Sequence, residues 1–587
     1  MAVIDWCILL SYLFLSLILG LLLAGRNKSE NDYFVAGRRL SGWLAGASMA
    51  ATTFSIDTPL YVAGIVATRG LAGNWEWWSF GFAHVAMTIV FAPMWRRSEV
   101  LTDAAFTELR YGGAPAAWLR GVKAFLLAIP VNCIGIGYAF LAMRKVAEAL
   151  DIVDGHLVFG VISDTLLLLI AVAALMLIYT VIGGLWAVVV NDLVQLILAL
   201  VGALAVAIAV ITAAGGMSEL ITRIDELKRP ELLSLFPWSW TANGFEWIGG
   251  AGISVATFVS FLTLQWWSFR RSDGGGEFIQ RMLATRDEKQ AKLAGWVFLV
   301  VNYIIRSWLW ILVALAGLVL LPAQQDWELS YPTLAVQFLP PIALGVVVVS
   351  LIAAFMSTVS TSVNWGASYL THDLYQRFIR PSAQKKELLL IGQLASVMLL
   401  VMGILTAIIS DSIGAIFRLV IAIGTGPGVV LVLRWFWWRI NAAAELAAMV
   451  CGFLIGFSTS VVPILQIEDY GLKLLFTTIS TGVVWLTVLA VTPPESQEVL
   501  KDFVLKVRPP GPGWRNLRKK FGVKPVDTLI SLVLRFLLGS GVLFGGLLGV
   551  GAFLLQQVIS GWTGLIVAVI SLFLLKRKKL FDIALTS

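Results

Sequence analysis

Apolar runs of about 20 residues recur along the whole chain, and each is long enough to cross the hydrocarbon core of a membrane as a helix. The chain has 587 residues, of which 59% are hydrophobic and 13% are charged. We identify about fifteen such runs, among them residues 3–24, 246–268, 414–437 and 529–555. The stretches between the runs are too short for a soluble domain of any size. The sequence therefore predicts an all-α polytopic membrane protein with about 15 transmembrane helices.

The net charge of +8 is unevenly distributed along the chain. Lys and Arg gather in alternate loops, at residues 26–39, 96–123, 270–292, 377–386, 501–524 and 576–579. Positive loops face the cytoplasm, so we expect a multi-pass protein of the cell membrane with its N-terminus outside and its C-terminus cytoplasmic. This distribution indicates membrane lipid rather than nucleic acid as the surrounding partner.

Residues that could support catalysis are scattered. Cys7, Cys133 and Cys451 all lie in apolar runs, and the three histidines are far apart in the sequence. The sequence contains no nucleophile with its base and no metal-ligand spacing. We therefore do not expect an enzyme.

Four hydroxyls lie within one long apolar run, on Ser357, Thr358, Ser360 and Thr361. Helical spacing places Ser357, Ser360 and Thr361 on one face, with Thr358 about 100° round the helix. Hard cations prefer such oxygen ligands, so the pattern indicates a sodium site. The alternative is that these small hydroxyl residues only allow close helix packing.

Two further segments are polar at membrane depth. Asp57 lies two residues after Ser55 and two residues before Pro59. The proline frees carbonyls in the preceding turn that could bind a cation, whereas a simple proline kink without a bound ion is the alternative. Glu76 and Ser79 are three residues apart and share a helix face, which suits a polar solute. The alternative for this pair is an acidic cap within an aromatic belt at the outer interface.

Charges within the bilayer are costly and often functional. Asp192 lies eight residues beyond Gly184, inside the bilayer if Gly183 and Gly184 form a tight turn, whereas the neighbouring Asn191 could serve helix packing alone. Arg306 lies too deep to reach the interface easily, so we expect it to pair with a carboxylate or an anionic solute.

Five segments in order resemble the sodium/solute symporter family: residues 31–38 (NDYFVAGR), 101–111 (LTDAAFTELRY), 179–192, 280–284 (QRMLA) and 353–375. The resemblance covers about residues 1–492 and implies a leucine-transporter-like 5+5 inverted repeat with flanking helices. The expected parts are a flanking helix and cytoplasmic loop (1–40), the first repeat (41–214), an external loop (215–243), the second repeat (244–440), two further helices (441–492), a basic cytoplasmic loop (493–528) and two additional C-terminal helices (529–587).

The resemblance also implies the ion sites. The sodium site common to this fold would use carbonyls of Ala51, Phe54 and Ala354 with hydroxyls of Ser357 and Thr358. A second sodium site, found in some members, would use Asp192, Ser357, Ser360 and Thr361. Sodium ion is therefore the expected cofactor, at one or two ions per solute.

For the solute site, the resemblance points to different relatives at different residues. Thr53, Ser55 and Thr58 resemble the hydroxyls that hold a carboxylate in sialic acid transporters, and Glu76 with Ser79 resembles the sugar-binding segment of galactose transporters. Arg306 stands where the latter carry a solute-contacting lysine, and Asp57 and Asn302 complete the candidate set. Residues 265–280 depart from the family, being longer, rich in glycine and without the Asn-Gln-Tyr of sugar carriers.

The sequence thus predicts a secondary active transporter that moves sodium and a small polar organic solute together by alternating access. The solute would be hydroxylated, sugar-like or carboxylate-bearing. Two alternatives remain: a symporter coupled to protons through Asp57 or Glu76, and a membrane sensor that binds solute without concentrating it.

Overall fold

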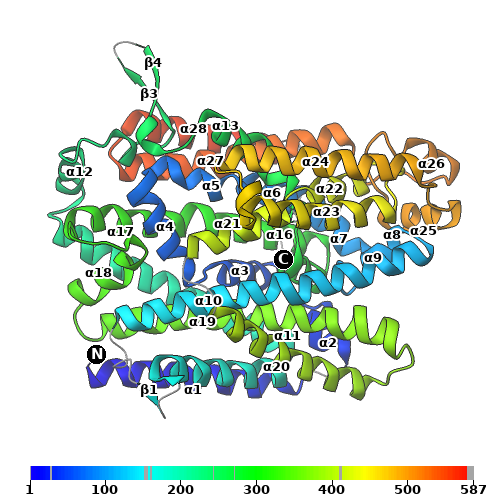
Figure 1. Cartoon of the computed structure of the whole chain (residues 1–587), viewed down its shortest axis with the longest axis horizontal. Helices are drawn as coiled ribbons and strands as arrows, with labels where there is room; N and C mark the ends of the chain where they lie inside the picture. Colours follow the sequence, from blue (N-terminus) through cyan, green and yellow to red (C-terminus); the bar gives the residue numbers. More distant parts are fainter. Residues whose placement is uncertain are drawn as a thin grey trace.

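The computed structural model describes residues 2–26, 29–150, 157–158, 162–241, 244–269, 271–408 and 413–577, and it is mostly helical (Figure 1). The helices of the N-terminal half are listed here: α1 (Val3–Ala24), α2 (Glu30–Val35), α3 (Gly42–Thr53), α4 (Asp57–Arg69), α5 (Trp75–Trp78), α6 (Phe80–Ala86), α7 (Ala92–Ser98), α8 (Phe106–Arg110), α9 (Gly113–Leu126), α10 (Asn132–Ala149), α11 (Asp164–Ala213), α12 (Met217–Asp225), α13 (Val255–Ser260), α14 (Trp266–Ser268) and α15 (Gly276–Ala284).

The helices of the C-terminal half follow: α16 (Glu288–Leu299), α17 (Arg306–Leu320), α18 (Ser330–Phe338), α19 (Ala343–Ser368), α20 (Lys385–Ile408), α21 (Ile413–Gly424), α22 (Pro427–Phe436), α23 (Ala442–Val461), α24 (Tyr470–Val491), α25 (Gln497–Val507), α26 (Arg515–Lys520), α27 (Leu529–Leu554) and α28 (Val558–Arg577). Two antiparallel hairpins complete the elements, β1 (Leu157–Val158) with β2 (Ile162–Ser163), and β3 (Trp238–Thr241) with β4 (Gly244–Trp247).

Among the described residues, 11 helices are long and apolar enough to cross a membrane, or up to 12 if the bent pair α3 and α4 is one span. The predicted count of about 15 is therefore not confirmed. Part of the difference has a clear origin, because α11 runs over 50 residues but turns at Gly184 (φ 55°, ψ −154°), so it contains two consecutive crossings. The positive φ favours glycine, and this turn confirms the break expected at Gly183 and Gly184.

Wider helical turns join several elements into longer rods. Residues 87–91 join α6 to α7, 127–131 join α9 to α10, and 300–305 join α16 to α17. Such turns with i→i+5 bonding often mark functional positions. The segment 300–305 matters below, because it carries Asn302 and leads directly into Arg306.

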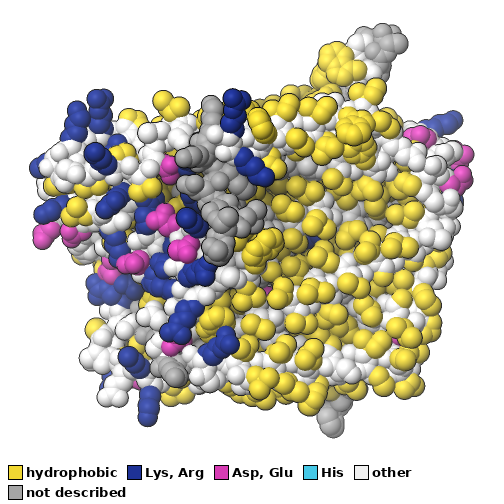
Figure 2. Space-filling view, turned by 180° about the vertical axis from the view of Figure 1, so that it is seen from behind, with side chains coloured by type: hydrophobic (Ala, Val, Ile, Leu, Met, Phe, Trp, Pro, Cys, Tyr) yellow, Lys and Arg dark blue, Asp and Glu magenta, His cyan; other side chains and the backbone are white. Residues whose placement is uncertain are grey.

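The long helices run side by side, and the bent pair α3 and α4 lies among them (Figure 1). Helix α19 packs on α11, α11 on α1, and α3 on α16. The basic segment after α24 is folded against the bundle, since Leu500, Phe503 and Trp514 are fully buried. Figure 2 shows Lys and Arg side chains gathered at one end of the molecule and apolar side chains over much of the rest. This distribution is that of a multi-pass membrane protein.

Candidate functional site

The candidate sodium ligands lie where α3 and α4 meet the middle of α19. Helices α3 and α4 are bent by 57° at a break of three residues. The Thr358 hydroxyl of α19 donates to the carbonyl oxygens of Thr52 and Ala354, each at 3.1 Å. A broken helix offers carbonyls that can coordinate a cation. Ala51, Phe54 and Ala354 are buried around this junction, so the segments that carry the predicted set meet here.

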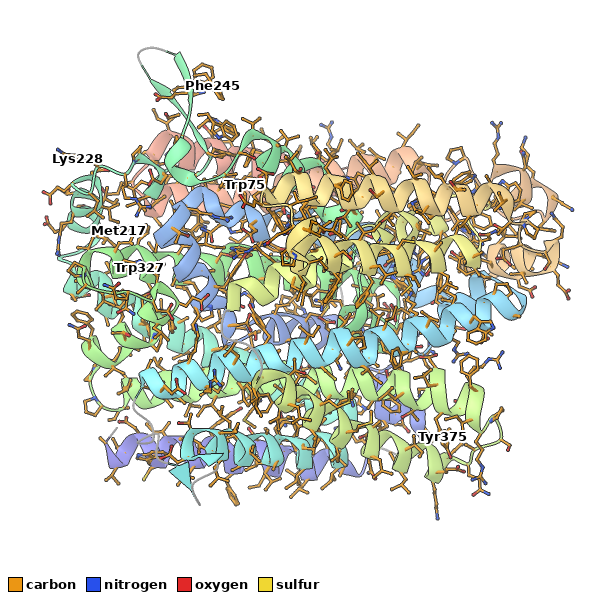
Figure 3. The ribbon with its side chains drawn as sticks, in the orientation of Figure 1. Trp75, Met217, Lys228, Phe245, Trp327 and Tyr375 are labelled. Atoms are coloured by element: carbon orange, nitrogen blue, oxygen red, sulfur yellow. The ribbon has the colours of Figure 1, made fainter. Side chains whose placement is uncertain are left out.

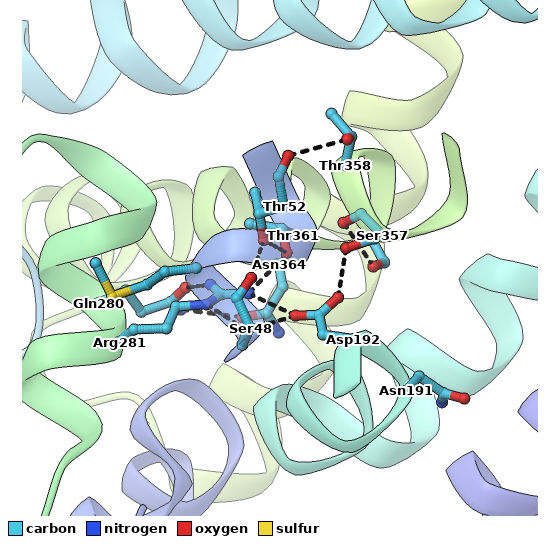
Figure 4. A network of polar contacts seen from close by, with 12 residues as sticks. Ser48, Thr52, Asn191, Asp192, Gln280, Arg281, Ser357, Thr358, Thr361 and Asn364 are labelled. Carbon is cyan, nitrogen blue, oxygen red and sulfur yellow. Dashed lines mark hydrogen bonds and ion pairs between the residues drawn. The ribbon is translucent and has the colours of Figure 1, made fainter. Parts of the chain in front are cut away.

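Ser357 points to the neighbouring cluster around Asp192 (Figure 4). Its hydroxyl donates to Asp192 Oδ1 at 2.6 Å, and the Ser48 hydroxyl donates to Oδ2 at 2.5 Å. Thr361 lies next to this cluster, with its Oγ1 3.1 Å from that of Thr52, and the Ser360 hydroxyl donates to the Ser357 carbonyl at 3.1 Å. The oxygen atoms implied for a second ion therefore come from neighbouring positions of α11 and α19.

Arg281 is the member of this cluster that sequence reasoning missed. Its Nη2 lies 3.5 Å from Asp192 Oδ2 and donates to Thr361 Oγ1 at 2.6 Å, while its Nε donates to the Ser48 hydroxyl at 3.1 Å. Arg281 and Asp192 are both fully buried. The residue belongs to the QRMLA segment, but nothing in that pattern indicates which carboxylate its guanidinium reaches. A second sodium ion would share Asp192 with this cation.

A cavity of about 300 Å³ opens beside the break in α3 and α4. Six of the eight predicted solute residues line it: Thr53, Ser55, Asp57, Thr58, Asn302 and Arg306. Thr358 lines it as well, so the junction of α3, α4 and α19 shares a wall with the cavity. The Thr53 hydroxyl donates to Asn302 Oδ1 at 3.0 Å, which ties the broken helix to the wide turn before α17.

Arg306 brings a positive charge to the cavity. Its side chain is 97% buried (3% exposed), its Nη1 donates to the Ala50 carbonyl at 3.1 Å, and it stacks on the rings of Phe54 and Trp310. No carboxylate among the described residues lies within ion-pair distance of Arg306, although Asp57, which lines the same cavity, attracts it electrostatically. The two opposite charges therefore line one cavity without direct contact, and the pairing of Arg306 with a carboxylate or an anionic solute stays a prediction.

Asp57 brings a negative charge to the cavity wall. It is 7% exposed, it accepts a hydrogen bond from the Ser55 hydroxyl, and it lies in the first turn of α4. A carboxylate in this position is favoured by the N-terminal end of the helix dipole. Asp57 therefore has local stabilisation that does not depend on a bound cation.

Glu76 and Ser79 do not belong to the cavity lining. Glu76 is fully buried and accepts hydrogen bonds from Arg69 Nη1 at 2.7 Å and from the Tyr61 hydroxyl at 2.8 Å. Ser79 Oγ accepts from Gln265 Nε2 at 3.2 Å. Tyr61 lines the cavity and separates it from Glu76. A direct solute role for Glu76 and Ser79 stays a prediction.

The glycine-rich segment that departs from the family forms part of the cavity wall. Arg271 and Glu277 both line the cavity and form an ion pair at 2.7 Å. Between them, Gly274, Gly275 and Gly276 all have positive φ, and the Asp273 carboxylate is held by Arg434 at 2.6 Å. The sequence shows that this segment is unusual, but nothing in it indicates that the charges of Arg271 and Glu277 reach the cavity.

Comparison with known proteins gives consistent relatives. The sodium:solute symporter family matches residues 33–452. The sodium/glucose cotransporter of Vibrio parahaemolyticus is 25% identical over 457 residues, covering 73% of this chain and 78% of that protein. The osmoregulated proline transporter of Bacillus subtilis is 26% identical over 461 residues, covering 75% and 85%.

A solved structure gives the same result for the fold. The substrate-bound, outward-open structure of a sodium-coupled sialic acid symporter has a TM-score of 0.67 with 22% identity, and the match covers 84% of this chain and 99% of that one. This likeness shows that the two chains share a fold. Because the family match spans more than half of the sequence, this chain belongs to the sodium:solute symporter family and is a multi-pass membrane transporter that couples sodium to a small solute.

Proposed function

We propose that the solute is a small hydroxylated molecule with an acidic group, moved by alternating access. The observation that carries this proposal is Arg306, a buried guanidinium in the cavity wall without an ion-pair partner among the described carboxylates. A buried charge is costly unless it is paired. A carboxylate on the solute would pair with Arg306, while Thr53 and Asn302 would bind its hydroxyls.

Sodium binds, in this proposal, between the break of α3 and α4 and the hydroxyls of α19. The ligands are the carbonyls of Ala51, Phe54 and Ala354 with the hydroxyls of Ser357 and Thr358. An ion there bridges two elements that also line the cavity through Thr53 and Thr358. Ion binding thus stabilises the cavity wall, and solute binding must favour the ion to the same degree.

A second sodium ion binds at Asp192, Ser357, Ser360 and Thr361. Support comes from the proximity of these side chains and from the negative charge of Asp192, which is shared with Arg281. The charge balance at this site therefore depends on both cations.

The orientation belongs to the same proposal. The N-terminus is outside and the C-terminus is cytoplasmic, with repeats at 41–214 and 244–440. The end of the molecule that carries most Lys and Arg in Figure 2 is then the cytoplasmic end.

A neutral sugar is the second candidate solute, and one contact favours it. Trp77 lines the cavity with its ring stacked on Tyr303 at 6.0 Å, and aromatic rings offer an apolar face with a polar edge. This candidate does not use the charge of Arg306.

Paired solutes distinguish the two candidates. Purified protein in proteoliposomes is given an inward sodium gradient and either a sugar acid or its neutral parent sugar, for several such pairs. We expect accumulation of an acid and weaker uptake of its parent. Arg306→Gln should remove that preference, and Arg306→Lys, which keeps the charge, should retain part of it.

Losing Arg306 should weaken binding of the acid about ten- to a hundredfold, since a hydrogen bond to a charged group contributes about 1.5–3 kcal/mol. Equal uptake of acid and parent, unaffected by Arg306→Gln, would instead favour the neutral sugar.

A further inference from the structure

The β3–β4 hairpin has one aromatic face and one polar face. Trp238 lies opposite Trp247, and Trp240 lies opposite Phe245, so these four rings share a face of the ribbon. Ser239 and Glu246 form the pair between them and point to the other side. The ribbon is therefore amphipathic along its length.

The two aromatic pairs have different surroundings. At the base, Trp238 stacks on Phe236 at 4.7 Å, and both Trp238 and Trp247 contact Phe258. Nearer the tip, Trp240 is 77% exposed and Phe245 is 56% exposed, and the two rings contact each other edge to face at 5.6 Å. The protein covers the base of the aromatic face and leaves its outer half uncovered.

The direction of the hairpin indicates what covers that half. Figure 1 shows the ribbon rising across the direction of the long helices, at the end of the molecule that carries α12. Figure 3 places Phe245 beyond the helical body, far from Tyr375 at the opposite end. An element that leaves the side of a membrane-spanning bundle extends in the plane of the bilayer.

Two physical limits fix the depth of the hairpin. Figure 2 shows apolar side chains covering the surface from which the hairpin rises, so the ribbon stands beside the lipid-facing zone. A two-stranded ribbon has open edges whose backbone groups cannot lie in hydrocarbon. Tryptophan side chains concentrate at the boundary between headgroups and acyl chains. That boundary satisfies the aromatic face and the backbone edges together.

We propose that the β3–β4 hairpin is a lateral membrane anchor, with Trp240 and Phe245 inserted at the headgroup boundary of the leaflet at this end of the molecule. Ser239 and Glu246 then face water. A two-stranded hairpin is only marginally stable in water by itself. Contact with lipid would order this one and fix it relative to α13, which begins eight residues after the hairpin.

The test compares the two faces of the ribbon in lipid nanodiscs, in which both membrane surfaces are accessible. Single cysteines replace Trp240, Phe245, Ser239 or Glu246 in a chain whose Cys7, Cys133 and Cys451 are changed to serine, and each carries a nitroxide label. The accessibility of each label to oxygen, which partitions into lipid, is compared with its accessibility to a water-soluble nickel chelate. Elution as a monodisperse species confirms that each labelled variant is folded.

We expect oxygen to dominate at positions 240 and 245 and the nickel chelate to dominate at positions 239 and 246. Dominance of the chelate at all four positions would place the hairpin in water and overturn the proposal. Low accessibility to both reagents at 240 and 245 would also overturn it, because a second copy or another protein would then cover the aromatic face.

Discussion

Thr358 lies at the junction of α3, α4 and α19 and also lines the cavity. Its hydroxyl contacts carbonyls of both α3 and α19, and its side chain lines the cavity wall. If sodium binds there, replacing the hydroxyl removes an ion ligand and a connection between the two helices. Effects on sodium binding should then appear even without a solute.

We predict that sodium raises the thermal unfolding midpoint of the wild-type protein and does so much less in Thr358→Ala. A ligand that binds only the folded state stabilises it by mass action. Thr358→Ser should retain the effect. Ser350→Ala is the matched control, because Ser350 is also buried in α19 but its hydroxyl, among the described residues, bonds only to Val347 of its own helix. An undiminished sodium effect in Thr358→Ala would argue against this ion site.

We predict that replacing Arg281 and replacing Asp192 change the stabilisation by sodium in opposite directions. Arg281→Gln leaves the buried carboxylate without its cation, which should cost about 3–5 kcal/mol of stability. Sodium can offset part of that loss, so sodium should stabilise Arg281→Gln more than the wild type, whereas it should stabilise Asp192→Asn less. Thermal unfolding across a sodium titration measures both. If the two variants change the stabilisation by sodium in the same direction, Asp192 is not shared between sodium and Arg281.

The residue types of the candidate site could be predicted from sequence better than their partners. Ser357 and Asp192 are recognisable because hydroxyls and carboxylates are unusual within apolar helices, and the structure brings the two into contact. Arg281 could not be assigned to Asp192, since that contact depends on how α15 and α11 both pack against α3 and α19. Glu76 is a second residue whose type was predictable but whose position was not. A charge at membrane depth is visible in the sequence, but its position behind Tyr61 rather than in the cavity wall is not.

Helices were predictable wherever one apolar run forms one element. Residues 3–24 and 529–555 were expected as crossings, and α1 and α27 follow these limits closely. Prediction was less successful where a helix breaks, because apolar composition does not record a change of direction. The run at 246–268 contains the end of β4, a tight turn at Gly249–Ala251, and the short helices α13 and α14 with a wide turn between them. The run at 414–437 divides into α21 and α22.

The C-terminal pair of helices, which lies beyond the family match, is attached through small residues. A Cβ atom at Gly551 of α27 would lie 1.6 Å from the Trp308 ring, and Trp308 Nε1 donates to the Leu547 carbonyl at 2.8 Å. Helix α27 can therefore approach α17 only because glycine stands at this contact. Trp308 also contacts Trp78, so α27 supports the aromatic segment near the cavity.

We predict that Gly551→Ala lowers the thermal unfolding midpoint, because overpacking of a tight contact costs about 1–3 kcal/mol. Gly482→Ala in α24 is the control, since its Cβ would lie no closer than 4.0 Å to another side chain and alanine favours a helix. The two variants are compared by thermal unfolding in the same detergent. Equal midpoints for Gly551→Ala and the wild type would mean that α27 shifts to accommodate the added methyl group without a loss of stability.

For the whole molecule, the proposed solute charge and the number of sodium ions determine the electrical character of transport. One sodium ion with a singly charged acid carries no net charge, so the membrane potential would not drive it. Two sodium ions with the same acid carry one positive charge inward. Each 100 mV of inside-negative potential then contributes about 2.3 kcal/mol to accumulation.

If the proposed second sodium ion binds at Asp192, this residue determines whether the transporter responds to voltage. We predict that an inside-negative potassium diffusion potential stimulates sodium-driven uptake of an acidic solute by the wild type, and that Asp192→Asn makes the remaining uptake insensitive to that potential. Asn191→Ala should keep the response, because the Asn191 side chain bonds to the carbonyls of Ala187 and Ser16 and not to the ion cluster. Uptake in proteoliposomes with and without valinomycin provides the measurement. A voltage response that survives in Asp192→Asn would place the second charge elsewhere, and a wild type without any response would indicate one sodium ion per acid.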